Sequence, residues 1–310
     1  MGRHKYSKLI SLLGTFLYLE QPIASLFIFA LFVAIIWKVI DPCLPGHVFQ
    51  IFSFYLWFAV PFFMLKIICT VSISKLLRPT KENDSCFIQA MGRNTWTDAE
   101  LTEKLNDIFL KAKAKTMTKL GAVLDRSNRG VEILRGAREC LERNALLREI
   151  GFEPGLPNRH LAEVAFFLYK RFDVAIIAQW EVAHAMFLLD EDAFVSMLYC
   201  EKVFLLWARD AYYPTIEVKR DSIAVMNHYG FRNPVEVAYP EMIFRALPIL
   251  WQLGVAPNIY TRWLMPCDFG SIQKWTKSRF FFALAYEALA RPHHVLKKWV
   301  TFAQPNGSSP

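Results

Sequence analysis

Two long apolar stretches near the N-terminus constrain this chain more than any other feature of its sequence. Residues 23–37 contain one residue that is not hydrophobic, and residues 51–65 contain two. A helix needs about 20 apolar residues to cross the hydrocarbon core of a bilayer, and with their flanks the two stretches reach this length at about 22–40 and 48–66. The sequence therefore predicts a two-helix transmembrane hairpin. A buried helical hairpin is the alternative.

Basic residues near the two stretches predict how the hairpin is oriented. Lysine and arginine are enriched on the cytoplasmic side of membrane spans. They flank the predicted hairpin on its outer sides, at Arg3, Lys5, Lys8, Lys66, Lys75, Arg78 and Lys81, whereas the turn between the spans has none. We therefore expect both termini to face the cytoplasm. Lys38 and Cys43 lie at the opposite end, and the sequence leaves their roles open.

The remaining chain predicts a helical domain. Residues 1–78 hold the basic N-terminal segment and the hairpin. Residues 79–95 are polar and are interpreted as a linker, and residues 304–310 are interpreted as a disordered tail. The pattern between them, over 96–303, is helical, and no segment shows sustained strand alternation. The fold class predicted is therefore all-α, a transmembrane hairpin followed by a cytoplasmic α-helical domain. Helices are expected within 96–119, 131–149, 158–171, 174–189, 191–209, 217–229 and 234–253, and the segments 257–263, 268–277 and 280–290 complete the fold.

Sequence signatures of enzymes are absent. The chain has no phosphate-binding loop, dinucleotide-binding glycine pattern, nucleophile elbow or zinc-protease pair. One set of residues predicts a membrane-tethered helical metalloenzyme as an alternative. Its metal site would comprise His160 with Glu163, and Glu181 with His184, each pair at i,i+3 spacing on successive helices. The other interpretation is a set of hydrogen-bonded polar residues on apolar helices. We expect a protein that is not an enzyme and has no metal or other cofactor.

An ordered series of glycine, proline, tryptophan and acidic residues marks the C-terminal third. It comprises Gly254, Pro257, Trp263, Leu264, Pro266, Asp268, Trp275, Glu287, His294 and Trp299. Its order and spacing resemble the end of the cytoplasmic domain in the DotM (IcmP) and TrbA family, although Met265 and Cys267 depart from the commoner pattern. We interpret these residues as specifying the fold, with the prolines and Asp268 at turns or helix caps.

The resemblance implies a function in macromolecular transfer. DotM-like proteins are inner-membrane subunits of the coupling complex of type IVB secretion or conjugation machines, where they associate with the coupling ATPase and sister subunits. Some bind glutamate-rich segments of substrate proteins. The resemblance therefore predicts a membrane-anchored, non-enzymatic adaptor in the bacterial inner membrane that receives acidic substrate segments or partner subunits through basic faces of its cytoplasmic domain. Whether the machine transfers DNA or protein effectors is left open. A purely structural scaffold with the same anchor is the alternative.

The distribution of charge along the chain indicates which segment could bind acidic partners. The net charge is +8, yet residues 79–310 hold 29 basic and 26 acidic side chains, so no sequence-specific nucleic-acid binding is expected. Arginine pairs well with carboxylates. Six arginines lie close together in sequence and are the candidates for binding acidic substrates: Arg126, Arg129, Arg135, Arg138, Arg143 and Arg148. The alternatives are a solvated helix face, with arginines paired to Glu132, Glu139 and Glu142, or contact with anionic lipid.

Overall fold

The second of two structural units contains nearly all of the described chain. The computed structural model describes residues 72, 75–91, 98–115, 131–134, 137–208, 215–261, 266–273 and 276–277. One unit comprises Met1–Leu76 and Phe280–Pro310, and the other comprises Leu77–Arg279. Among the described residues, no helix has the length and apolar character needed to cross a membrane. The two predicted transmembrane spans lie outside the described residues.

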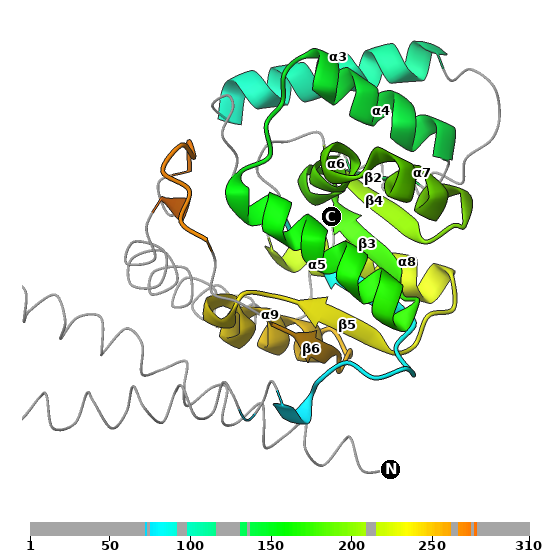
Figure 1. The fold of residues 1–310 in the computed structure, drawn as a ribbon, viewed down its shortest axis with the longest axis vertical. Coiled ribbons are helices and arrows are strands. Elements are labelled where there is room, and N and C mark those ends of the chain that lie inside the picture. The colour runs from blue at the N-terminus through cyan, green and yellow to red at the C-terminus, as the bar shows by residue number, and fades with distance from the viewer. Residues whose placement is uncertain are drawn as a thin grey trace, which may run out of the picture. The chain divides into compact units, whose positions relative to one another are not determined.

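A six-stranded sheet forms the centre of the Leu77–Arg279 unit (Figure 1). The strand order is β2-β4-β3-β1-β5-β6. Neighbouring strands run parallel except at one edge, where β2 pairs antiparallel with β4. The strands are β1 (Ser85–Ile88), β2 (Val131–Leu134), β3 (Ala175–Gln179), β4 (Val203–Ala208), β5 (Pro234–Val237) and β6 (Asn258–Tyr260).

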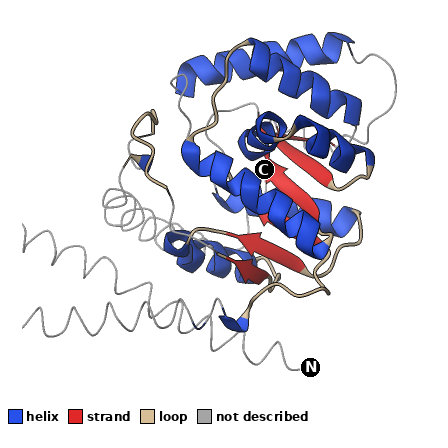
Figure 2. Cartoon of the chain, viewed as in Figure 1, coloured by secondary structure: helices blue, strands red, loops and turns tan. Residues whose placement is uncertain are grey.

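Helices cover both faces of this sheet, as Figure 2 shows. They are α3 (Asp98–Lys115), α4 (Ala137–Glu149), α5 (Leu156–Phe172), α6 (Trp180–Leu189), α7 (Glu191–Tyr199), α8 (Thr215–His228) and α9 (Pro240–Gln252). On one face, Phe87 of β1 and Ile177 of β3 pack in a core with Val218 of α8 and Leu250 of α9. Helices α5 and α6 contact the central strands on the other face. The domain is therefore a three-layer α/β/α sandwich.

The predicted all-α fold class is wrong, because six strands interrupt the helical pattern. The central strand β1 lies within 79–95, which the sequence indicated to be an irregular linker. The segment predicted as a helix over 174–189 begins with β3 and continues as α6, and 191–209 contains α7 followed by β4. Likewise, β2 precedes α4 in 131–149, and β5 precedes α9 in 234–253.

Burial explains why the strands were missed. Strands of a parallel sheet covered on both faces are apolar along their whole length, so they lack the alternation that identifies a half-buried strand. All five residues of β3 and all four of β1 and β5 are buried. In addition, β3 leads directly into α6, with no glycine or proline between them, so the apolar run of the strand merged with that of the helix.

The helix ends follow local sequence rules more closely. Gly254 is the C′ residue of α9, and its φ of 81° lies in the left-handed region. The N–H of Val255 donates to the carbonyl of Leu250, and that of Gly254 donates to the carbonyl of Trp251. These two bonds form a Schellman motif, whose left-handed residue favours glycine. Pro240 does not kink a helix but begins α9, where its missing N–H has no cost.

Candidate functional site at the carboxyl edge of the sheet

The strand order identifies one edge of the sheet as a candidate binding site. After β1 the chain first forms the antiparallel edge strand β2. Among the parallel strands it moves outward from β1 to β3 and β4, then returns across the sheet to β5 on the other side of β1 and continues to β6. The direction of winding therefore reverses between β1 and β5. Open doubly wound sheets bind ligands outside the carboxyl ends of their strands at such a switch point. In this chain, that place lies just beyond Ile88 and Val237.

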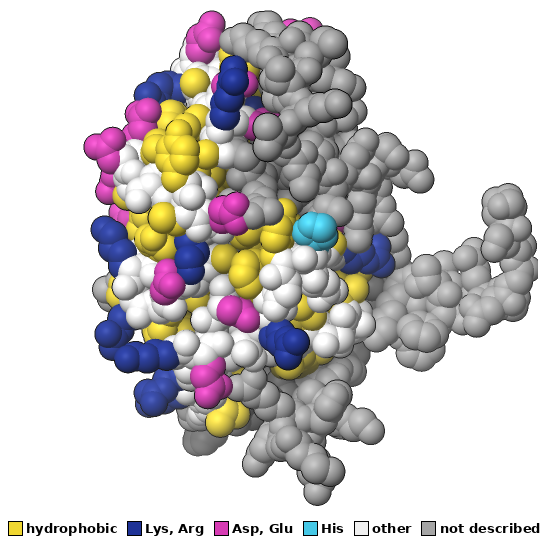
Figure 3. All heavy atoms as spheres, turned by 90° about the vertical axis from the view of Figure 1, so that its right-hand side faces the viewer, with side chains coloured by type: hydrophobic (Ala, Val, Ile, Leu, Met, Phe, Trp, Pro, Cys, Tyr) yellow, Lys and Arg dark blue, Asp and Glu magenta, His cyan; other side chains and the backbone are white. Residues whose placement is uncertain are grey.

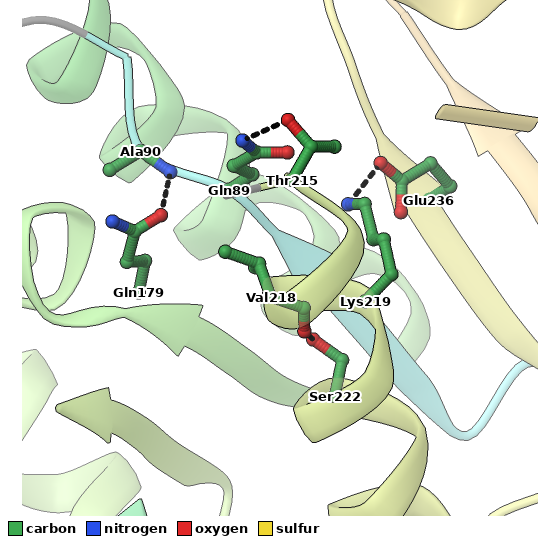
Figure 4. Close-up of polar contacts among 8 residues, drawn as sticks. All are labelled: Gln89, Ala90, Gln179, Thr215, Val218, Lys219, Ser222 and Glu236. Atoms are coloured by element: carbon green, nitrogen blue, oxygen red, sulfur yellow. Dashed lines mark hydrogen bonds and ion pairs between the residues drawn. The ribbon is translucent and has the colours of Figure 1, made fainter. Parts of the chain in front are cut away.

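Polar side chains from distant segments meet at this edge (Figure 4). Gln89 follows β1, and its Nε2 donates to Oγ1 of Thr215, the first residue of α8, at 2.9 Å. These residues are 126 positions apart in sequence. The next residue, Ala90, donates its N–H to Oε1 of Gln179, the last residue of β3, at 3.1 Å. The ends of β1 and β3 and the start of α8 are therefore joined by side-chain hydrogen bonds.

The start of α5 is attached to the same edge. Asn158 accepts a hydrogen bond from the N–H of Met91 at 2.6 Å. The hydroxyl group of Tyr239, which follows β5, donates to the carbonyl oxygen of Pro157 at 2.7 Å and lies 3.2 Å from Nδ1 of His160. We call Gln89, Asn158, Gln179, Thr215 and Tyr239 the switch-point cluster. Their contacts position the backbone that leaves β1 and β5.

Helix N-termini and one unused acceptor determine what this edge can bind. Helices α6 and α9 begin within three residues of the ends of β3 and β5, and α8 begins at Thr215. The first N–H groups of a helix have no partner within the helix and carry a partial positive charge. Oε1 of Gln89 is buried and has no hydrogen-bond partner among the described residues. The edge therefore combines donors suited to an anion with an acceptor available to a donor group.

A buried ion pair lies next to this cluster. Lys219 of α8 is 0% exposed and Glu236 of β5 is 2% exposed, and Nζ of the lysine lies 2.5 Å from Oε1 of the carboxylate. Burial raises the pKa of the Glu236 carboxyl group, while the Lys219 ammonium acts in the opposite direction. Burial, and then the nearby carboxylate of Glu236, also raise the pKa of the Cys86 thiol, so this cysteine stays protonated and unreactive.

The described arginines of the predicted acidic-substrate site have partners within the chain. Arg138 pairs with Glu142 at 3.0 Å, as the solvated-face alternative predicts, and 78% of its side chain is exposed. Arg148 pairs with Glu191 at 2.9 Å. Arg143 is buried, pairs with Glu139 at 3.2 Å, and lies over the ring of Trp207 at 4.8 Å from its centroid. An exposed basic face therefore cannot include Arg143. Arg126, Arg129 and Arg135 lie outside the described residues.

The structure does not bring together the residues of the alternative metal site. His184 is buried, and its Nδ1 lies 3.0 Å from Oδ1 of Asn144 in α4. Burial lowers the pKa of His184 to about 4, so its ring is neutral. His160 contacts Tyr239, Glu181 accepts a bond from Gln179, and Glu163 is exposed. Across the described part of the chain, no three His, Cys, Asp or Glu side chains form a group that could hold a metal ion.

Four residues of the C-terminal series are described: Gly254, Pro257, Pro266 and Asp268. The carboxylate of Asp268 accepts hydrogen bonds from the N–H of Leu156 at 2.7 Å and from that of Gly270 at 3.2 Å. It thus attaches its own loop to the first residue of α5. Trp263, Leu264, Trp275, Glu287, His294 and Trp299 lie outside the described residues.

Sequence reasoning missed the switch-point cluster because the strands themselves were missed. The signal in the sequence is a polar residue at the end of a short, buried apolar run, as at Gln89 and Gln179. Without the strand order, such glutamines resemble ordinary helix positions. Comparison with known proteins adds no further assignment. No family model matches this chain, and no match is found among curated proteins or among solved structures.

Proposed function

We propose that this protein binds a small anionic molecule at the carboxyl edge of its sheet, between β1 and β5. The switch-point cluster is the observation that carries this proposal. Its members come from five separate segments, yet they meet at the position where doubly wound sheets bind ligands. A phosphate group is the anion best suited to the edge, because the first N–H groups of helices bind phosphate oxygens directly.

Binding of inorganic pyrophosphate to the purified full-length protein tests the proposal. We expect saturable binding by calorimetry at constant ionic strength. Replacing Gln89→Leu or Thr215→Val should raise the Kd roughly tenfold, because a hydrogen bond to a charged group contributes about 1.5–3 kcal/mol. Gln252→Leu is the matched control, since Gln252 is exposed at the last residue of α9. An unmodified protein that does not bind pyrophosphate would contradict the proposal, as would variants that bind equally well.

We also propose the adaptor function that the C-terminal resemblance implies: a subunit of a conjugation or type IVB secretion coupling complex, anchored in the inner membrane through the predicted spans. The exposure of Arg138 and Arg148 on α4 supports it, because exposed ion pairs are weak and their glutamates can be exchanged for those of a partner. Basic and acidic side chains lie among one another on the described part of the face seen in Figure 3, so an acidic partner bound to that part would contact separate basic side chains and acidic ones.

A glutamate-rich peptide and a pull-down test the adaptor proposal. The double substitution Arg138→Glu and Arg148→Glu should weaken peptide binding several-fold and reduce its dependence on salt. Arg220→Glu is the control, because this partly exposed arginine of α8 also pairs with a glutamate, Glu217. The intact protein, solubilised from cells that carry the transfer machine, should recover the coupling ATPase. Recovery without the ATPase or any sister subunit would count against the adaptor function.

A further inference from the structure

The buried pair of Lys219 and Glu236 lies beneath the site that the switch-point cluster defines. Thr215 and Lys219 are four residues apart, so they share one face of α8. Side chains on a helix point back toward its N-terminus, which directs the Lys219 ammonium toward Thr215 and the Gln89 side chain bonded to it. Figure 4 shows this arrangement, with Glu236 reaching the same ammonium from β5. Glu236 lies beside Phe87 of β1 in the sheet register, at the switch point itself.

The pair has hydrogen-bonding capacity that the described residues do not use. Oε2 of Glu236 is buried and has no hydrogen-bond partner in the described part of the chain. An ammonium group has three donors. Burial of two charges has a large desolvation cost, and apolar residues of similar volume often replace a buried pair with no loss of stability. Stability alone therefore does not account for a charged pair at this position.

We propose that Lys219 and Glu236 select the ligand of this site, and that the ligand is a phosphate ester carrying a free hydroxyl group, such as a sugar phosphate. Lys219 binds a phosphate oxygen, and Oε2 of Glu236 accepts a hydrogen bond from the hydroxyl group. To reach the pair, the ligand replaces the hydrogen bond between Gln89 and Thr215. The inference rests on the proposed binding function and adds to it the class of ligand and the residues that distinguish it.

Ribose 5-phosphate and inorganic phosphate separate the two contacts. We expect the full-length protein to bind ribose 5-phosphate at least about tenfold more tightly than inorganic phosphate, because only the sugar can donate to Glu236. Glu236→Gln should abolish most of this preference while leaving the Kd for inorganic phosphate within about twofold. Because this substitution leaves Lys219 without its carboxylate, a second variant is needed to guard against misfolding.

The double substitution Lys219→Met and Glu236→Leu removes both charges together and retains an apolar core. It should raise the Kd for both probes at least about tenfold. The matched control is Glu217→Leu with Arg220→Met, which removes the ion pair between Glu217 and Arg220, partly exposed on the same helix. A folded double variant that binds both probes like the unmodified protein would show that the pair is structural and overturn the inference, as would equal affinity of the unmodified protein for the two probes.

Pyrophosphate distinguishes a failure of this inference from a failure of the proposed function. If the unmodified protein and the double variant both bind pyrophosphate in a Gln89-dependent manner, the proposed anion site at the carboxyl edge is supported. In that case the proposed role of Lys219 and Glu236 is refuted. If the unmodified protein binds none of the three anions, both proposals are refuted.

Discussion

Helix α4 and the carboxyl edge of the sheet are two polar regions that differ in the ion-pair and hydrogen-bond partners of their side chains. The arginines described in α4 each have a glutamate partner, and Arg143 and Arg148 also lie over aromatic rings. The carboxyl edge has few charges, yet it contains buried acceptor atoms on Gln89 and Glu236 that receive no hydrogen bond from any described residue. Oε2 of Glu142 in α4 is also buried without a hydrogen-bond partner among the described residues, but only at the carboxyl edge do such atoms lie beside a switch point of the sheet.

This difference shows that the number of charged residues in a segment does not by itself predict a binding site. Arginine-rich segments are visible in the sequence, but their partners determine whether they bind another molecule. A buried polar atom without a partner has a free-energy cost, so its presence in a folded protein requires an explanation. At the switch point, the ligand that we propose would supply one.

The largest expected effect comes from breaking the buried pair at the edge. Glu236→Leu leaves the Lys219 ammonium in an apolar core, and we expect the free energy of unfolding to fall by about 3–5 kcal/mol. Urea denaturation of the full-length protein measures this. The double substitution Lys219→Met and Glu236→Leu should recover most of the loss. If the single substitution costs no more than the double one, the ammonium is solvated rather than buried.

His184, which contacts Asn144 of α4, predicts a pH dependence of stability. Its pKa is lowered to about 4 in the folded protein, against 6.5 in the unfolded chain, so the unfolded state binds more protons between these values. Stability is therefore fully present above pH 6.5 and is lost as the pH falls toward 4, by up to roughly 3 kcal/mol. His184→Gln should remove this component when unfolding free energies are compared across pH. Identical pH profiles for the two proteins would contradict the prediction.

The smallest expected effect distinguishes two arginines of the same helix. Arg143 is buried between Glu139 and Trp207, so Arg143→Met should lower the free energy of unfolding by about 2 kcal/mol. Arg138→Met should change it by less than about 0.5 kcal/mol, because its ion pair is exposed. Thermal unfolding of the two variants provides the comparison. Equal effects would mean that burial does not separate these residues.

The sequence predicted some helices and no strands. Helices α5 and α8 begin and end within about two residues of their predicted bounds, because a 3.6-residue apolar period and proline or glycine punctuation act locally. The strands of this sheet are only three to six residues long. Short, buried runs such as β3, β4 and β5 do not differ in pattern from segments of buried helix, so a local reading assigned them to the neighbouring helices, whereas β1 was assigned to a linker.

The candidate site was even less accessible to sequence reasoning. The residues chosen from the sequence were charged or metal-ligating types at regular spacing, and the structure separates His160 from His184 and buries Arg143. The switch-point cluster is composed mainly of neutral residues such as Gln89 and Thr215. Residues of this kind acquire a role only when distant segments bring them together.

By itself, the sequence determined features that depend on neighbouring residues: helix periods, the cap at Gly254, and the apolar stretches near the N-terminus. Tertiary structure alone decided the strand order, the reversal between β1 and β5, and which polar atoms were left without partners. The physical reason is the distance along the sequence between the residues that interact. Helix periods and caps depend on residues a few positions apart, whereas the hydrogen bond between Gln89 and Thr215 depends on segments 126 residues apart that meet only after the sheet has formed.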